Sequence, residues 1–186
     1  DPPAPTDETT YAYDPQRLVT CGGRQDWTST YDPRGRALTR TTPDAGTTSY
    51  TYDAADQMVT RTDARNVTLT DTYDNLGRIT ERRQGTTLLA AWTFDTVAKG
   101  QPSTSTRYSN GNAYTSAITS YDDGYRPLST TVAIPAAEGV LAGTYTNQFT
   151  YKPDGSPNTV VTASAAGSPV GGLPLETLQV RLQQRR

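Results

Sequence analysis

Aromatic and hydroxylated residues alternate in short runs along the chain, and this alternation is the most regular feature of the sequence. In the run Tyr50-Thr51-Tyr52, a period of two places both rings on one side of an extended strand and the threonine on the other. Comparable runs occupy residues 11–13, 92–94 and 149–151. Residues 88–92 are the best helical candidate, but they lead directly into one of these runs. The pattern therefore predicts β-strands throughout.

The aromatic runs belong to a sequence repeat that is marked by an aromatic residue followed by aspartate. The aromatic members of successive pairs stand at positions 13, 31, 52, 73, 94 and 121, so the central pairs are evenly spaced. A degenerate copy, Tyr151-Lys152, follows the last of them. In two copies a Gly-Arg pair comes shortly after the aspartate. The residues that we predict to define the repeat structurally are Tyr13, Asp14, Tyr31, Asp32, Gly35, Arg36, Tyr52, Asp53, Tyr73, Asp74, Gly77, Arg78, Phe94, Asp95, Tyr121 and Asp122.

The aspartate of each pair is expected to end a strand and to begin a turn. Its carboxylate can accept hydrogen bonds from backbone amides one or two residues further on, and Gly35 or Gly77 can adopt a positive φ without steric cost. Second turns are expected near residues 42–46, 63–66 and 82–85. Each regular unit then contains two strands of about six residues, which is the size of a β-hairpin. Because one hairpin cannot bury its own apolar face, neighbouring units should associate into a continuous sheet.

The pattern Tyr-Thr-Tyr-Asp-x-x-Gly-Arg-x-apolar-Thr resembles the YD repeat of the RHS (rearrangement hot spot) family. This family includes Rhs polymorphic toxins, toxin-complex shell components and teneurins. Residues 30–39 and 72–80 carry the closest copies. Three units depart from the pattern: Asp56-Gln57 and Ala98-Lys99 replace Gly-Arg, and the first unit is shortened after Asp14.

The resemblance implies an all-β fold, in which an array of antiparallel YD-repeat hairpins forms a curved sheet and part of the wall of a β-spiral shell. In bacterial members of the family such a shell encloses a C-terminal toxin, and in teneurins it supports adhesion domains. The implied partners are further YD repeats of the same parent chain and an enclosed toxin or effector domain. The implied location is secreted or at the cell surface, and the chain then reads as a fragment of a longer protein.

The spacing of the repeats and the local composition divide the chain into four predicted segments. Residues 1–10 are predicted to be a linker, and the segment 11–95 is predicted to form regular repeats of about 21 residues. Residues 96–155 contain longer, degenerate repeats. Residues 156–186 are a Gly/Ser/Pro-rich connection followed by an atypical C-terminus, because the next expected aromatic pair is absent near residues 179–181.

The composition narrows the chemistry that the chain can perform. It has no histidine and one cysteine, which excludes Ser-His-Asp and Cys-His nucleophiles, imidazole and thiolate zinc sites, and an internal disulfide. The formal charge is −2 and no basic cluster is present, which argues against nucleic acid as a partner. No apolar run is long enough for a membrane-spanning helix, and the N-terminal residues do not resemble a signal peptide. We therefore expect no catalytic residues, no metal and no cofactor.

The remaining candidates for chemistry are better explained by turns. Asp122-Asp123 precedes a glycine, as in a turn, and calcium loops need several carboxylates within about a dozen residues. The segment Asp32-Pro33-Arg34-Gly35 is half of the self-cleaving aspartyl motif of bacterial RHS proteins, but its sister units carry the same turn. Exposed aromatic rows leave one alternative function open, namely a surface adhesin or carbohydrate-binding module.

Overall fold

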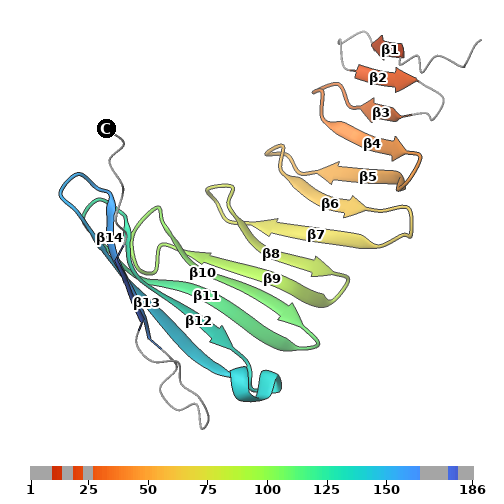
Figure 1. The fold of residues 1–186 in the computed structure, drawn as a ribbon. Helices are drawn as coiled ribbons and strands as arrows, with labels where there is room; N and C mark the ends of the chain where they lie inside the picture. The colour runs from red at the N-terminus through yellow and green to blue at the C-terminus, as the bar shows by residue number, and fades with distance from the viewer. Residues whose placement is uncertain (1–9, 14–18, 23–26, 164–175, 180–186) are drawn as a thin grey trace, which may run out of the picture. The chain divides into compact units, whose positions relative to one another are not determined.

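The computed structural model describes residues 10–13, 19–22, 27–163 and 176–179, and these residues form antiparallel β-strands joined by short turns (Figure 1). Within the described residues the single helical element is a 3₁₀ segment, η1 (Ala136–Leu141). The predicted all-β array of hairpins is confirmed. Residues 1–9 of the predicted linker (1–10) lie outside the described residues, as do residues 164–175 and 180–186 of the predicted connection and C-terminus (156–186). Thr10 belongs to a strand, and residues 157–163 and 176–179 also form strands.

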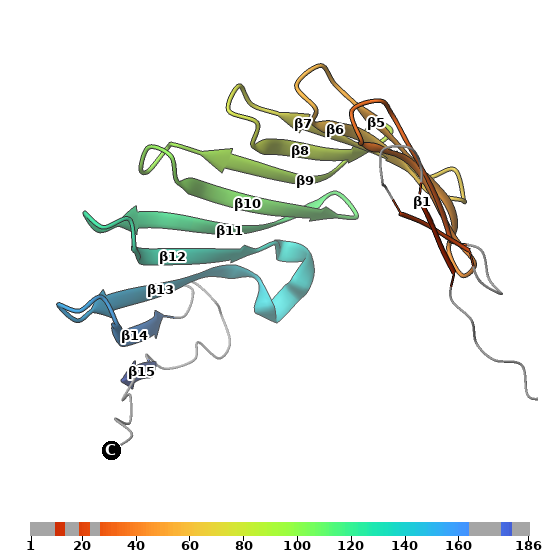
Figure 2. The same ribbon diagram turned by 90° about the horizontal axis from the view of Figure 1, so that it is seen from above.

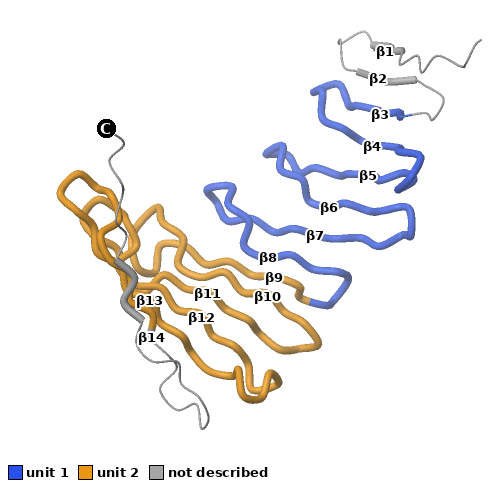
Figure 3. The backbone as a smooth tube through the Cα atoms, in the orientation of Figure 1, with its two compact units in different colours: residues 1–87 blue, residues 88–186 orange. Residues whose placement is uncertain are grey.

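The chain divides into two compact units, residues 1–87 and residues 88–186 (Figure 3). In the first unit, β1 and β2 pair with each other, and strands β3 to β8 pair in chain order. Their bounds are β1 (Thr10–Tyr13), β2 (Val19–Gly22), β3 (Thr28–Tyr31), β4 (Ala37–Thr42), β5 (Gly46–Tyr52), β6 (Met58–Thr62), β7 (Thr68–Tyr73) and β8 (Ile79–Gln84).

In the second unit, strands β9 to β15 also pair in chain order, and each strand is antiparallel to the next. Segment η1 lies in the connection between β12 and β13. The strand bounds are β9 (Thr87–Phe94), β10 (Pro102–Ser109), β11 (Asn112–Tyr121), β12 (Pro127–Ile134), β13 (Gly143–Tyr151), β14 (Pro157–Ala163) and β15 (Glu176–Gln179).

Each unit is a single layer of strands: the neighbouring strands of the first unit lie side by side in Figure 1, and those of the second unit in Figure 2. No large side chain of the described residues is fully buried. Along β5, half-buried and exposed side chains alternate, with Tyr50 and Tyr52 on the more covered face and Thr51 on the more exposed one. This alternation is the one that the Tyr-Thr-Tyr pattern predicts. With no second layer above either face of the described strands, the sheet depends on contacts between neighbouring strands.

Threonines gather on one face of the first unit. The strand register places the following residues on this threonine face: Thr28, Thr30, Thr39, Thr41, Thr47, Ser49, Thr51, Thr60, Thr62, Thr68, Thr70 and Thr72. Their hydroxyls meet across neighbouring strands, and the Oγ1 atoms of Thr30 and Thr39 are 2.6 Å apart, for example. Four further pairs lie at 2.5–3.1 Å: Thr41–Thr47, Thr51–Thr60, Thr62–Thr68 and Thr72–Thr80. Such cross-strand pairs contribute roughly 0.2–1 kcal/mol each.

Candidate functional site

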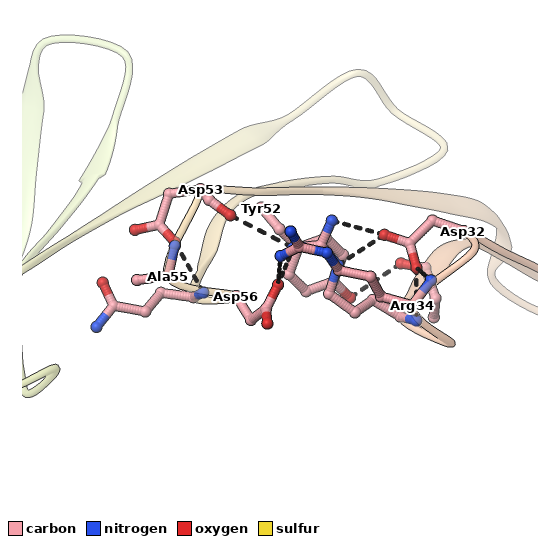
Figure 4. Close-up of polar contacts among 9 residues, drawn as sticks. Asp32, Arg34, Tyr52, Asp53, Ala55 and Asp56 are labelled. Carbon is pink, nitrogen blue, oxygen red and sulfur yellow. Dashed lines mark hydrogen bonds and ion pairs between the residues drawn. The ribbon is translucent and has the colours of Figure 1, made fainter.

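The turn that begins at Asp32 shows how the repeat closes its hairpin (Figure 4). The amides of Arg34 and Arg36 each donate to Oδ1 of Asp32 at 2.9 Å. Nε of Arg36 donates to Oδ2 of the same carboxylate at 2.6 Å. The backbone closes around these bonds, because the amide of Asp32 donates to the Arg36 carbonyl and the amide of Gly35 donates to the Asp32 carbonyl. The carboxylate thus satisfies two backbone amides of a five-residue turn.

The same arrangement recurs in four other turns of the described residues. In each, Oδ1 of the first aspartate accepts the amide two residues further on, as the sequence predicts, and also the amide four residues further on, which the sequence did not predict. The four aspartates are Asp53, Asp63, Asp74 and Asp122, with donor distances of 2.9–3.0 Å. The turn at Asp63 joins β6 to β7, at the other end of the strands, where the sequence indicated only an unspecified second turn.

The fourth residue of each turn has a positive φ. Gly35 and Gly77 both have φ 80°, the conformation that was predicted for them. Asp56 takes the same place with φ 64°. The replacement of Gly-Arg by Asp56-Gln57 therefore leaves the turn geometry intact. Tyr125 also occupies this position, with φ 60°, and a bulky residue in the left-handed region is strained.

Two turns depart from the common geometry. The turn after Phe94 is longer, because the amide of Asp95 donates to the carbonyl of Gln101 and the amide of Gly100 donates to Oδ1 of Asp95. The turn at Lys152 keeps the common backbone bonds although lysine has no acceptor in its side chain. There Asp154 instead accepts from the amide of Ser156 at 2.9 Å.

In four repeats the tyrosine contacts the preceding repeat. Its hydroxyl donates to the carbonyl of the first residue after the preceding turn. The four bonds that the structure shows are Tyr52 to Ala37 (2.9 Å), Tyr73 to Met58 (2.8 Å), Tyr121 to Pro102 (2.7 Å) and Tyr151 to Pro127 (2.8 Å). The guanidinium of the preceding turn also stacks on the tyrosine ring in two repeats, Arg36 over Tyr52 and Arg126 over Tyr151, each 4.7 Å from the ring centre. These contacts link successive hairpins.

Asp56 connects two turns through arginines. Its Oδ1 accepts from Nη1 of Arg34 at 2.7 Å and from Nη1 of Arg36 at 2.6 Å (Figure 4). Arg36 also donates to the carbonyl of Asp53 at 3.3 Å. The residue that breaks the Gly-Arg pattern of one repeat thereby binds the arginines of the preceding one. Sequence reasoning missed this role, because the pairing depends on the alignment of neighbouring turns.

Hydrogen bonds within the turns lower the pKa of Asp32, Asp74 and Asp122. For Asp74 and Asp122 the largest cause is the backbone amide four residues on, to which an arginine side chain adds, while desolvation acts in the opposite direction. Desolvation is the largest influence on Asp32 and by itself raises its pKa. The hydrogen bonds from Arg36 and Arg34 outweigh it, so the pKa of Asp32 is also lowered. These carboxylates are held in the ionised form that the turn requires.

A partly buried ion pair lies close to Tyr73 in the first unit. Asp71 on β7 is 5% exposed, and both of its carboxylate oxygens accept from Arg82 on β8, from Nε and Nη2 at 2.7 Å. Asp71 stands two residues before Tyr73, where other copies of the repeat have an aromatic residue. An aspartate at a position that is aromatic in other repeats could have drawn attention to Asp71. Only the strand register shows that Arg82 is its partner.

The predicted repeat residues fall into two groups by position. The aromatic residues stand at or near strand ends, and each aspartate in the described residues begins the turn that follows. Tyr13 ends β1, but its side chain is not described, and Asp14 lies outside the described residues. The described carboxylates do not gather into a cluster of three or more that could hold a metal ion.

Comparison with known families identifies part of the chain. Residues 31–68 match the sequence profile of the family described as RHS Repeat. The search of curated proteins gave no match.

Solved toxin structures share the fold. The crystal structure of TcdB2-TccC3-Cdc42 matches 95% of this chain with a TM-score of 0.68 and 16% identity, and that of TcdB2-TccC3-TEV matches 83% with 0.64 and 15%. The structure of a Photorhabdus luminescens Tc holotoxin pore matches 86% with 0.61 and 16%. The matched segments are 9–10% of those chains, so this chain spans about a tenth of their length. Residues 31–68 of this protein thus match the RHS Repeat family, and its hairpin array has the fold of the segments of the solved structures that it matches.

Proposed function

We propose that the chain is a structural segment of an RHS-repeat shell, which encloses or displays a C-terminal toxin or effector domain in the extracellular space. The observation that carries the proposal is the way in which one hairpin binds the next. Tyrosine hydroxyls, stacked arginines and Asp56 each contact the preceding repeat, and no second layer of described residues covers the strands. A single-layer sheet of this kind is suited to form a wall between two spaces.

The similarity to TcdB2-TccC3 structures supports this role. One of the matched structures is a Tc holotoxin pore, and the matched segments share the fold of this chain. A secreted shell is consistent with that similarity. Within the described residues no helix has the length and apolar character needed to span a membrane.

We also infer that this segment performs no catalysis. The aspartates that could act as acids or bases are engaged in structure, since Asp32, Asp53, Asp74 and Asp122 accept backbone amides of their own turns. The pKa of Asp32, Asp74 and Asp122 is lowered by these bonds, and a carboxylate that is held ionised is a weak general acid at neutral pH.

Limited proteolysis of the full-length gene product tests the shell. Residues 27–163 should resist a protease in the intact protein, because their turns are short and their strands are paired with neighbours. Rapid release of this segment from the intact protein would contradict the proposal. A pull-down that recovers a downstream domain, still bound after cleavage of the chain between the two, would support enclosure of that domain.

A carbohydrate-binding adhesin is the second candidate, and Tyr125 favours it. This residue is 53% exposed at a turn tip and is held in a strained backbone conformation, which is a feature of binding residues. The repeat tyrosines argue against an extensive aromatic platform, because their hydroxyls and rings are engaged by the preceding repeat. A glycan array with the wild-type chain and the Tyr125→Asn variant separates the two roles: only an adhesin would show Tyr125-dependent glycan binding.

A further inference from the structure

Two arginines in the first unit have no polar partner among the described residues. Arg40 lies on β4 and Arg61 on β6, and both are exposed. All other arginines in residues 27–87 form an ion pair with a carboxylate: Arg34, Arg36, Arg65, Arg78, Arg82 and Arg83. The charge of Arg40 and Arg61 is therefore available to a partner molecule.

The strand register places the two arginines on opposite sides of β5. Arg40 is directly opposite Thr48, and Arg61 is directly opposite Tyr50. Thr48 and Tyr50 are two residues apart on β5, so all four side chains share one face, the one opposite the threonine face. With neighbouring strands about 4.8 Å apart and a rise of about 3.4 Å per residue, the Cα atoms of Arg40 and Arg61 are roughly 12 Å apart.

Apolar groups flank one of the arginines. Leu69 on β7 is directly opposite Arg61, on the side away from Tyr50. Arg61 thus stands between a half-buried tyrosine ring and a half-buried leucine. Among the described strands β3 to β7, Asp71 is the only acidic residue on this face, and Arg82 already neutralises it. This face therefore carries two arginines without an acidic partner among the described residues, and one of them is flanked by the apolar groups of Tyr50 and Leu69.

We propose that this face of the first unit is a docking surface for an acidic polypeptide segment, with carboxylates bound by Arg40 and Arg61 and an apolar side chain seated against Tyr50 and Leu69. Guanidinium groups bind carboxylates through two parallel hydrogen bonds. In an extended segment, residues four apart lie on one face and are separated by about 13 Å, close to the spacing of the two arginines. A nucleic acid fits less well, because two cations cannot neutralise a continuous row of phosphates.

Fluorescence anisotropy with the whole 186-residue chain tests the surface. The probe is a labelled synthetic peptide of repeated Glu-Thr-Leu-Thr, which presents a carboxylate at every fourth position with an apolar residue between. The wild-type chain should bind the peptide, and Arg40→Gln and Arg61→Gln should each weaken binding by about tenfold, the loss expected for one charge-assisted contact. The same peptide with glutamine in place of glutamate should not bind.

Arg65→Gln is the matched control. Arg65 is exposed in the same unit but is paired with Asp63 in its own turn, so its substitution changes the net charge equally and should leave the affinity unchanged. Equal weakening by Arg65→Gln would show non-specific attraction and would overturn the proposal. Failure of the glutamate peptide to bind, or tighter binding of a single-stranded oligothymidine with the same arginine dependence, would also overturn it.

Thermal unfolding measured by circular dichroism tests whether weaker peptide binding by a variant results from a less stable fold. Because neither arginine has a polar partner in the described residues, both Arg→Gln variants should keep the unfolding temperature of the wild-type chain. A lowered unfolding temperature for either variant would show that its side chain stabilises the sheet, and that result would contradict the assigned role.

Discussion

The two units consist of the same kind of hairpin but differ in the number of residues between successive repeats. In the first unit the repeat tyrosines stand at positions 31, 52 and 73 and are evenly spaced. In the second unit the aromatic residues stand at positions 94, 121 and 151, a wider and uneven spacing. The difference shows which parts of the repeat are fixed by physical contacts and which parts only connect them.

The extra residues of the second unit are placed in different elements. The turn from Asp95 to Gln101 is longer than the five-residue turn at Asp32, and β10 and β11 have 8 and 10 residues. The following repeat keeps the five-residue turn at Asp122 and inserts segment η1 between β12 and β13. Length is therefore tolerated in either turn and in the strands.

The contact between the tyrosine and the preceding repeat persists in spite of these insertions. The hydroxyl reaches the first residue of the preceding returning strand at sequence separations of 15, 15, 19 and 24 residues. The register of the strands is thus held constant while loop length varies. Since the entropy of closing a loop rises only slowly with its length, such insertions cost little.

The largest expected effect comes from a contact that is specific to the first unit. Asp71→Ala leaves the guanidinium of Arg82 without its two carboxylate bonds, and we expect a loss of about 2–3 kcal/mol in unfolding free energy, reduced from a fully buried pair because Arg82 is partly exposed. Chemical denaturation with circular dichroism measures the loss. The double variant Asp71→Leu/Arg82→Leu should regain most of it, since both charges are then absent. A double variant as unstable as the single one would contradict this interpretation.

Substitutions at the fourth residue of the turn, which has a positive φ, should change the free energy of unfolding in opposite directions in the two units. Gly77→Ala should cost about 1–2 kcal/mol, because alanine is strained at φ 80° and its Cβ would lie 2.8 Å from Nε2 of Gln57. Tyr125→Asn should stabilise by about 1 kcal/mol, because asparagine tolerates this conformation better than tyrosine. Leu76→Ala, at an exposed neighbouring position, serves as the control with little effect. Destabilisation by Tyr125→Asn would mean that the ring stabilises the turn.

The hydroxyl of the repeat tyrosine should be worth the same in both units. Tyr52→Phe and Tyr121→Phe each remove one hydrogen bond to a carbonyl and should each cost about 1 kcal/mol. Tyr50→Phe is the control, because its hydroxyl has no polar partner in the described residues. A clear difference between Tyr52→Phe and Tyr121→Phe in thermal unfolding would show that the longer connection weakens the contact.

Acid should produce the smallest effect per turn, because the aspartates are screened by solvent. The folded-state pKa of Asp32, Asp74 and Asp122 is lowered, so their contribution to stability is complete above the ordinary carboxyl pKa of about 4 and is lost as the pH falls through the lower folded-state value. Unfolding temperatures should be constant from neutral pH to about pH 5 and should decline below about pH 4. Stability that increases on acidification in this window would contradict the assignment of these bonds.

The sequence was sufficient to predict the local structure of the repeat. The Tyr-Thr-Tyr-Asp pattern specifies the faces of β5 and the start of the turn at Asp53, because period two and carboxylate–amide bonding act within a few residues. Contacts between repeats could not be predicted in the same way. The bonds of Asp56 to Arg34 and Arg36, and of Asp71 to Arg82, depend on which residues the register places opposite one another.

Amide hydrogen exchange tests most directly whether the turn is constant while the spacing varies. The amides of Arg36 and Arg78 in the first unit and of Arg126 in the second all donate to the first aspartate of their turns. The structure predicts similar slow exchange for these three amides, and faster exchange for the amide of Asp123, which has no bonding partner in the described residues. If the Arg126 amide exchanged as fast as that of Asp123, the common turn would not be maintained in the second unit.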